Sequence, residues 1–191
     1  MLLMARFGVR DFLLLTGYLG EQIQRYFGTG KKWGLDIAYS QETTLLGTGG
    51  ALKNAAALLQ EEFLLLNGDT YLSIDYALLV KGFRSSHKLG MLSVYENSQH
   101  RFKSNVRLSE NGFVEAYGKE GLQGASYVDA GAHVFRKDIL HLIPDGKVCS
   151  LEEEIFPKLI ETRELAAFPV RQRFYDMGSF AELEVAKEAL S

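Results

Sequence analysis

Two runs of apolar residues that do not alternate with polar ones predict buried strands in the first half of the chain. They are Asp11–Thr16 (DFLLLT) and Glu62–Leu66 (EFLLL). Strands covered on both faces of a parallel sheet have this pattern, because both faces then need apolar side chains. Leu35–Tyr39 is predicted as a third strand between them.

Helical patterns separate these strands and indicate the fold class. Gly20–Phe27 places Ile23 one turn before its last residue, and Gly49–Leu59 is rich in Ala and Leu. A further helix is predicted at Tyr76–His87. Helices and strands that alternate in this way form layered α/β domains. We therefore predict an α/β fold.

The second half of the chain is richer in strands. Short polar turns, including Asn111-Gly112, separate predicted strands at Gly90–Tyr95, Lys103–Leu108, Phe113–Tyr117 and Tyr127–Phe135. Ser150 and Ser179 each stand three residues before a glutamate. This capping-box pattern predicts that a helix begins at each of the two serines.

Composition narrows the class of protein. With 191 residues, 47% of them hydrophobic, the chain is long enough for one well-buried domain that spans residues 1–191. The net charge of −3 argues against a nucleic-acid partner bound through bulk charge. No apolar run approaches the roughly 20 residues that cross a bilayer, which argues against a membrane partner. A single cysteine, Cys149, leaves no internal disulfide and fits a cytoplasmic location.

Glycines and a carboxylate stand near strand ends, where α/β proteins bind ligands. In Leu45–Ala56 (LLGTGGALKNAA), three glycines at a helix start would let a phosphate, ribose or base approach the backbone, although a flexible loop has the same composition. Asp69 follows the strand at Glu62–Leu66 and suits Mg²⁺. The alternative is that Asn67 and Asp69 are ordinary turn residues.

The same segment imitates a dinucleotide-binding fingerprint, because Asp69 lies 20 residues beyond Gly49. Two features disagree with that interpretation. Polar residues rather than a buried strand precede the glycines, and Leu52 stands where the third glycine should be. A nicotinamide-dependent oxidoreductase is therefore a minor alternative.

Five motifs in order resemble the sugar-1-phosphate nucleotidylyltransferase family: ETTLLGTGGALKNA, LLLNGDTYLSID, YVDAGAHVF, SLEEEIFPKL and RFYDMGSFAELEVA. The chain looks closest to the branch that acts on bacterial hexose and heptose 1-phosphates. The resemblance implies a Rossmann-like, mostly parallel mixed sheet flanked by helices, of the nucleotide-diphospho-sugar transferase type. It also implies a nucleotide-binding half at residues 1–96 and a β-rich, sugar-phosphate-binding half at residues 97–191.

The resemblance further implies a reaction and its residues. A sugar 1-phosphate oxygen would attack the α-phosphorus of a nucleoside triphosphate in line and expel pyrophosphate, with Mg²⁺ as the cofactor. Asp69 and Asp176 match two aspartates that share the metal, and Lys119 matches the lysine that holds the sugar phosphate, although this chain reads Lys-Glu where most relatives read Glu-Lys. The implied catalytic residues are Asp69, Asp176 and Lys119; the nucleotide-binding residues are Gly47, Thr48, Gly49, Gly50 and Gly68; the sugar-phosphate-binding residues are Lys119, Asp129 and Gly131.

The glycine-rich G-G-x-G-T-R loop with which family members begin has no match here, and MLLMARFG reads like the end of the helix that follows it. The expected fold is therefore an N-terminally truncated one. Three hypotheses follow: a nucleotidylyltransferase, a catalytically impaired relative that binds a nucleotide or sugar phosphate, and a chain with a structural role only. An uncovered edge at Asp11–Thr16 would also favour a homo-oligomer.

Overall fold

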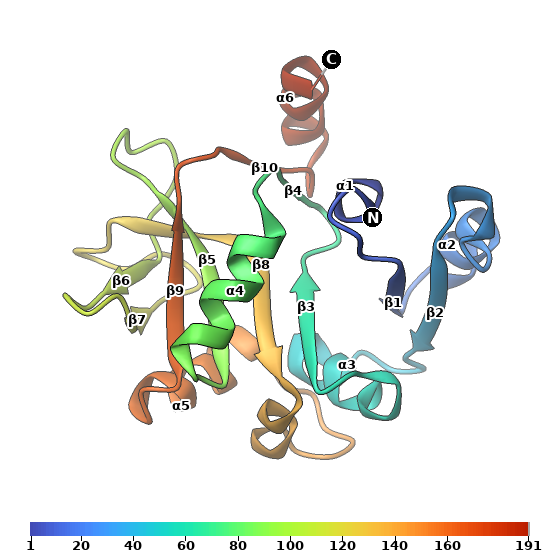
Figure 1. Cartoon of the computed structure of the whole chain (residues 1–191), viewed down its shortest axis with the longest axis horizontal. Helices are drawn as coiled ribbons and strands as arrows, with labels where there is room; N and C mark the ends of the chain where they lie inside the picture. The colour runs from blue at the N-terminus through green and yellow to red at the C-terminus, as the bar shows by residue number, and fades with distance from the viewer. Residues whose placement is uncertain (191) are drawn as a thin grey trace.

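The computed structural model describes residues 1–190, which form a mixed α/β structure (Figure 1). The strands are β1 (Asp11–Thr16), β2 (Asp36–Gln41), β3 (Glu62–Leu66), β4 (Thr70–Leu72), β5 (Gly90–Glu96), β6 (Val106–Leu108), β7 (Val114–Tyr117), β8 (Tyr127–Arg136), β9 (Leu165–Val170) and β10 (Phe174–Asp176). The α-helices are α1 (Leu2–Ala5), α2 (Gly20–Phe27), α3 (Gly47–Asn54), α4 (Tyr76–Ser86), α5 (Phe156–Glu161) and α6 (Phe180–Leu190).

Strand β8 lies at the centre of a six-stranded mixed sheet. The order is β7-β6-β8-β5-β9. Strand β3 also pairs with β8, at Ala132–Arg136, on the edge opposite β5. Strand β8 runs antiparallel to both β3 and β5, whereas β5 and β9 are parallel. The predicted α/β class, with a mixed sheet flanked by helices, is confirmed. Two short ladders, β1–β2 and β4–β10, accompany this sheet.

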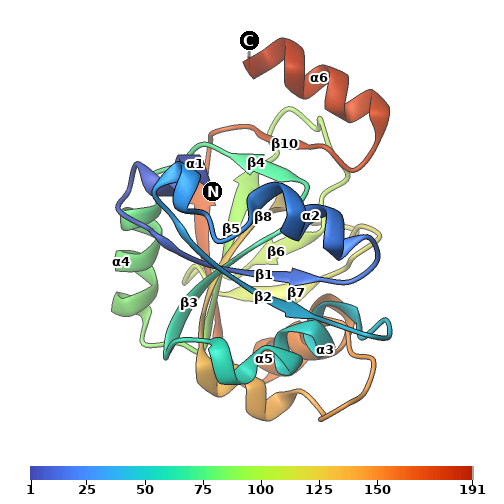
Figure 2. The ribbon, with the colours of Figure 1, turned by 90° about the vertical axis from the view of Figure 1, so that its right-hand side faces the viewer.

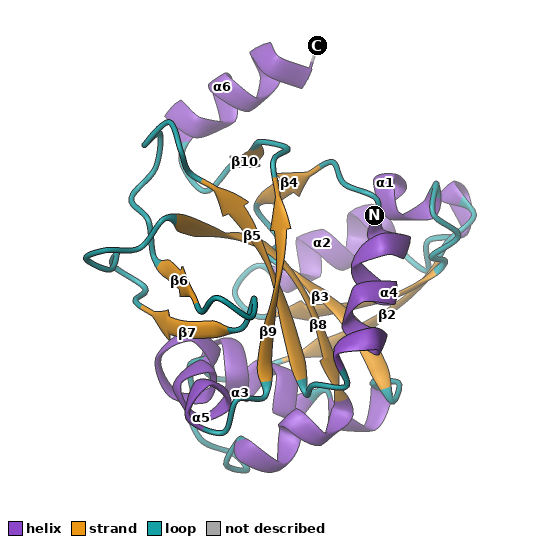
Figure 3. Ribbon diagram, turned by 60° about the vertical axis from the view of Figure 1, so that its left-hand side comes forward, coloured by secondary structure: helices purple, strands orange, loops and turns teal. Residues whose placement is uncertain are grey.

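Apolar clusters cover the two faces of the sheet, as alternate residues of β5 illustrate. Met91 and Tyr95 belong to a buried cluster with Phe83 of α4. Leu92 and Val94 belong to a second cluster, which includes residues of α3 and α5. Because successive strand residues point to opposite faces, α4 covers one face and α3 and α5 cover the other (Figure 3).

The ladder of β1 and β2 lies beside β3 without pairing with it (Figures 1 and 2). Within residues 1–190, β1 pairs only with β2 and β3 only with β8. The side chains of Phe12–Leu15 and Phe63–Leu65 are accordingly only half-buried. The prediction of two strands is confirmed, but the prediction that both faces are fully buried is wrong, because each strand has a neighbour on one edge only.

Several element boundaries differ from those predicted. The helix predicted at Gly49–Leu59 is α3 followed by a 3-10 turn at Ala56–Leu58. In the capping box at Ser150, the N–H of Glu153 donates to the serine hydroxyl as predicted. The N–H of Ser150, however, donates to the side chain of Glu154 and not to that of Glu153. Strands β4, β9 and β10 were not predicted.

None of the helices between residues 1 and 190 has the length and apolar character that crossing a bilayer requires.

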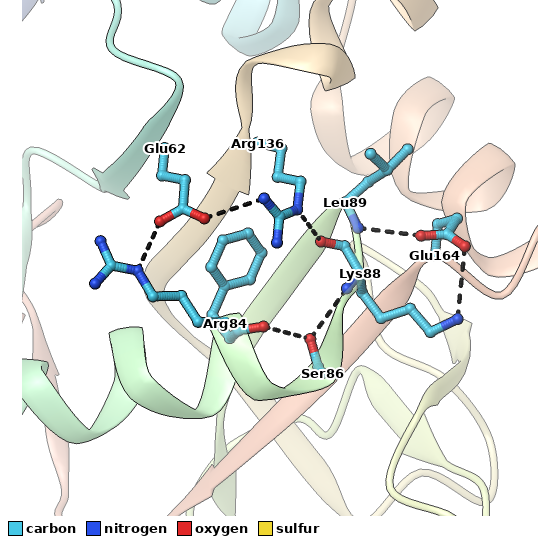
Figure 4. A network of polar contacts seen from close by, with 8 residues as sticks. Glu62, Arg84, Ser86, Lys88, Leu89, Arg136 and Glu164 are labelled. Carbon is cyan, nitrogen blue, oxygen red and sulfur yellow. Dashed lines mark hydrogen bonds and ion pairs between the residues drawn. The ribbon is translucent and has the colours of Figure 1, made fainter.

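A network of charged side chains joins four elements where β3 begins and β8 ends (Figure 4). Glu62 accepts hydrogen bonds from Arg84 Nε at 2.7 Å and from Arg136 at 3.1 Å. Arg136 also donates to the carbonyl of Lys88, whose ammonium group pairs with Glu164 at 3.5 Å. The network therefore fixes α4 and the ends of β3, β5 and β8 at the edge opposite the C-terminal end of β3.

The position of Glu62 between two arginines predicts its contribution to stability. Glu62→Gln should lower the free energy of unfolding by about 1 kcal/mol, because its side chain is only 24% exposed and both charge-assisted bonds weaken. Glu115→Gln, which removes a pair with Arg107 at the surface, is the control and should cost about 0.5 kcal/mol or less. Urea unfolding of both variants measures the difference; equal losses would contradict this role of the network.

Candidate functional site

The ladder of β4 and β10 brings together two aspartates that are 107 positions apart in the sequence. Asp176 pairs with Thr70 in this antiparallel ladder, so it stands beside Asp69, the residue that precedes β4. The backbone N–H of Met177 donates to the carbonyl of Asp69 at 2.7 Å. Both segments lie beyond the C-terminal end of β3 (Figure 1), which is the edge at which ligands of α/β sheets bind.

The carboxylates of the two aspartates approach the same point beside Gly178. Asp176 Oδ1 lies 3.1 Å, and Asp69 Oδ2 3.3 Å, from the point that a Cβ on Gly178 would occupy. The N–H of Gly178 donates to Asp176 Oδ1 at 2.8 Å, and both aspartates are exposed. Two exposed carboxylates that approach one point fit Mg²⁺, which takes one or two protein carboxylates together with waters and phosphate oxygens.

The turn that carries Asp69 is seated on β8. The N–H of Asn67 donates to the carbonyl of Gly131 at 3.0 Å. Gly131 has a φ of +73°, and a Cβ there would lie 3.0 Å from Thr70 Oγ1 and 3.1 Å from Asn67 Nδ2. Gly131, expected near the sugar phosphate, is thus placed directly beside this turn, and its lack of a side chain allows the close approach.

Asp129, expected among the sugar-phosphate-binding residues, has its carboxylate turned into the protein. Its Oδ1 contacts His133 Nε2 at 2.8 Å and accepts from the N–H of Gly131 at 3.0 Å, while its Oδ2 accepts from the Tyr117 hydroxyl at 3.1 Å. The Asp129 side chain is only 9% exposed. With three internal partners already around this buried carboxylate, the geometry supports an internal role rather than direct ligand contact.

The surroundings of Asp129 determine its protonation state. Burial alone would raise the pKa of its carboxyl group, but the charge and hydrogen bond of His133, helped by the Gly131 N–H and the Tyr117 hydroxyl, hold this pKa below its usual value. Burial and the nearby Asp129 raise the pKa of Tyr117, which therefore stays a protonated donor. Because the folded-state pKa of Asp129 is lowered, its contribution to stability is present at neutral pH and is lost as the pH falls through that pKa.

The glycine loop makes contacts that the sequence did not predict. The N–H groups of Gly49 and Gly50 both donate to the carbonyl of Cys149, at 2.8 and 3.2 Å. A Cβ on Gly47 would lie 2.7 Å from that same carbonyl oxygen, and one on Gly50 would lie 2.7 Å from the carbonyl of Lys147. The N–H groups of Gly49 and Gly50 are therefore engaged within the protein, and close packing against residues 147–149 requires glycine at these positions. Contact of these glycines with a nucleotide stays a prediction.

Thr48 and Lys119 approach the same helical segment, Leu151–Ile155. Thr48 donates its hydroxyl to Glu152 at 2.7 Å, and Lys119 Nζ pairs with Glu153 at 3.5 Å. Both Thr48 and Lys119 are exposed. The remaining predicted residue, Gly68, has no heavy atom within 4 Å of where its Cβ would be, so the space beside it is open.

Sequence reasoning missed the contribution of Gly178, Glu152 and Glu153 to this arrangement. The Asp176-Met177-Gly178 pattern contained a signal for Gly178, because a glycine two residues after an aspartate leaves room beside the carboxylate. Glu153 was interpreted as the capping residue of a helix, and Glu152 was given no role. Their partners are 104 positions away for Glu152 and 34 positions away for Glu153, so no local pattern could have indicated these pairs.

Comparison with known proteins shows the family to which this chain belongs. The family model described as "Nucleotidyl transferase" matches residues 1–191. Mannose-1-phosphate guanylyltransferase of Mycobacterium tuberculosis is 30% identical over 176 residues, which are 90% of this chain and 49% of that protein. D-glycero-alpha-D-manno-heptose 1-phosphate guanylyltransferase of Aneurinibacillus thermoaerophilus is 26% identical over 90% of this chain and 74% of its own.

A solved structure, HddC from Yersinia pseudotuberculosis, is similar with a TM-score of 0.85 and 25% identity, covering 99% of this chain and 82% of that one. The chain spans about half the length of the first curated relatives that it matches. The match over all 191 positions confirms the resemblance that the five motifs indicated. This chain belongs to the nucleotidyl transferase family.

Proposed function

We propose that this protein transfers a nucleotidyl group from a nucleoside triphosphate to a sugar 1-phosphate, with Mg²⁺ held by Asp69 and Asp176. The observation that carries the proposal is the convergence of these two carboxylates on the space beside Gly178. The names of the relatives favour a guanine nucleotide and a mannose or heptose 1-phosphate as the first substrates to test.

In the proposed reaction, an oxygen of the sugar phosphate forms a bond to the α-phosphorus while the bond from that phosphorus to pyrophosphate breaks. The bound cation would neutralise phosphate charge. Asp69 and Asp176 would hold it, and the rigid β4–β10 ladder would orient both carboxylates. Lys119 can exchange Glu153 for a substrate phosphate, because both side chains are at least half exposed.

A second candidate function is nucleotide-sugar or sugar-phosphate binding without turnover. It is favoured by the hydrogen bonds of Gly49 and Gly50 to Cys149, which engage N–H groups that would otherwise be available to phosphates. The same bonds argue against the dinucleotide-binding alternative, in which such N–H groups hold a pyrophosphate.

Pyrophosphate release tests the proposed reaction directly. Incubation with GTP, Mg²⁺ and mannose or heptose 1-phosphate should release pyrophosphate, and Asp69→Asn should reduce the rate at least about a hundredfold while the melting temperature stays unchanged, because only a metal ligand is lost. Heat stability that rises with Mg²⁺ and GDP-mannose, without pyrophosphate release, would support the binding function instead. An Asp69→Asn variant as active as the wild type would remove Asp69 from the site.

Gly178→Ala tests the space between the carboxylates without changing either of them. The added methyl group would stand 3.1 Å from Asp176 Oδ1 and 3.3 Å from Asp69 Oδ2, so it should displace the cation and weaken the activation by Mg²⁺ about tenfold or more. Ser179→Ala, one residue further along, is the control and should leave the Mg²⁺ dependence as it is. An unchanged Mg²⁺ titration of Gly178→Ala would place the metal elsewhere.

Two further glycine variants separate packing from ligand contact. Gly50→Ala should lower the free energy of unfolding by about 2 kcal/mol, because its methyl group would meet the backbone of Lys147 at 2.7 Å. Gly68→Ala should change stability by less than about 0.5 kcal/mol, because the space around it is open. In the proposed site Gly68 borders the nucleotide, so Gly68→Ala should also weaken nucleotide binding, measured by calorimetry. A Gly50→Ala protein of wild-type stability would contradict the packing role.

A further inference from the structure

A bulge in β8 lies directly under the turn that carries Asp69. In the pairing of β5 with β8, Leu92 stands opposite His133 and Val94 opposite Asp129. Two steps along β5 therefore correspond to four steps along β8, and Gly131, with φ +73°, is at the middle of the longer segment. Bulges of this kind bend a strand locally and change the direction of the side chains on it.

The side chains of Asp129 and His133 connect the two ends of this bulge. His133 Nε2 lies 2.8 Å from Asp129 Oδ1, and the side chains are 4% and 9% exposed. The same Oδ1 accepts from the N–H of Gly131 at the centre of the bulge. One buried oxygen thus holds both the far end and the middle of the irregular segment.

The bulge in turn holds the metal-site turn. The carbonyl of Gly131 accepts from the N–H of Asn67, and the Cα of Gly131 faces Asn67 Nδ2 and Thr70 Oγ1 closely enough that a Cβ would stand 3.0–3.1 Å from them. Asp69 lies between these two residues. The bulge is therefore in direct contact with the turn on both sides of Asp69.

Burying this polar pair is costly for a purely structural strand. Apolar residues of similar size would fill such a position without the desolvation of a carboxylate. His133 Nδ1, moreover, is buried without a hydrogen-bond partner among the described residues. A polar pair that tolerates an unmade hydrogen bond, at the base of a site with two carboxylates, indicates a role in arranging that site.

We propose that Asp129 and His133 are positioning residues that hold the β8 bulge closed and thereby set the placement of Asp69 relative to Asp176. Neither side chain touches the cation or the substrate. The consequence for metal binding rests on the proposed function, whereas the consequence for the Asn67–Thr70 turn does not.

Two variants test the proposal, with a matched control. Asp129→Asn keeps the shape and removes the charge, and the double variant Asp129→Leu with His133→Leu removes both polar groups, so that no unpaired charge is left in the core. Asn97→Ala is the control, because Asn97 is a buried polar residue of the β5–β6 loop whose bonds go to residues 101–104, away from the bulge.

Two readouts are measured on each protein: Mn²⁺ affinity by electron paramagnetic resonance, and hydrogen exchange of the Asn67–Thr70 amides. The proposal predicts that Mn²⁺ affinity falls about tenfold or more in both test variants. It also predicts faster exchange at Asn67–Thr70 in both, with neither change in Asn97→Ala.

The two readouts distinguish the possible failures. If the wild type binds no Mn²⁺, the proposed metal function fails, and the exchange experiment still decides whether the pair holds the turn. If the double leucine variant folds and keeps both the wild-type exchange at Asn67–Thr70 and any Mn²⁺ affinity of the wild type, the positioning role is overturned. Equal effects in Asn97→Ala would also overturn it, because loss of stability alone would then explain the data.

Discussion

The backbone ladder between β4 and β10 is the constraint on which the candidate site depends. Asp69 and Asp176 are 107 positions apart in the sequence, so no local pattern brings their carboxyl groups to one place. Their side chains are held together because the backbones around them are hydrogen-bonded, with Met177 donating to the carbonyl of Asp69 and Asp176 paired with Thr70. In the proposed function, this ladder places two carboxylate ligands beside one divalent cation.

Strand β8 connects this ladder to the rest of the molecule. It pairs with β3 on one edge and with β5 on the other, so its bulge at Gly131 is fixed from both sides. Tyr117, which donates to Asp129, is followed along the chain by Gly118 and Lys119, the predicted sugar-phosphate residue. Asp129 is therefore connected to the Asp69 turn through Gly131, and to Lys119 through Tyr117.

The sequence predicted those features that local patterns determine. The apolar runs of β1 and β3 and the helix α2 were located at their observed boundaries, because burial and helical periodicity act over a few residues. Strands β4 and β10 have three residues each and mixed polarity, so no periodicity could indicate them. The link between Asp69 and Asp176 came from the family resemblance, and the structure supplied its geometry.

At two places in the site, the structure shows hydrogen bonds within the protein that the sequence did not indicate. The N–H groups of Gly49 and Gly50 and the carboxylate of Asp129 are all engaged by residues that local patterns do not reveal as neighbours. The residue type shows what a group can bind. It does not show whether another residue of the protein already occupies that group in the fold. Satisfied groups in the interior support the site, and only the exposed groups, such as Asp69 and Asp176, are available to a ligand.

Anomalous diffraction from crystals grown with Mn²⁺ and a nucleotide sugar would test the central claim most directly. The account predicts a single strong anomalous peak beside Gly178, within coordination distance of carboxylate oxygens from both Asp69 and Asp176. A peak that contacts neither aspartate, with the nucleotide sugar bound in the same crystal, would contradict it.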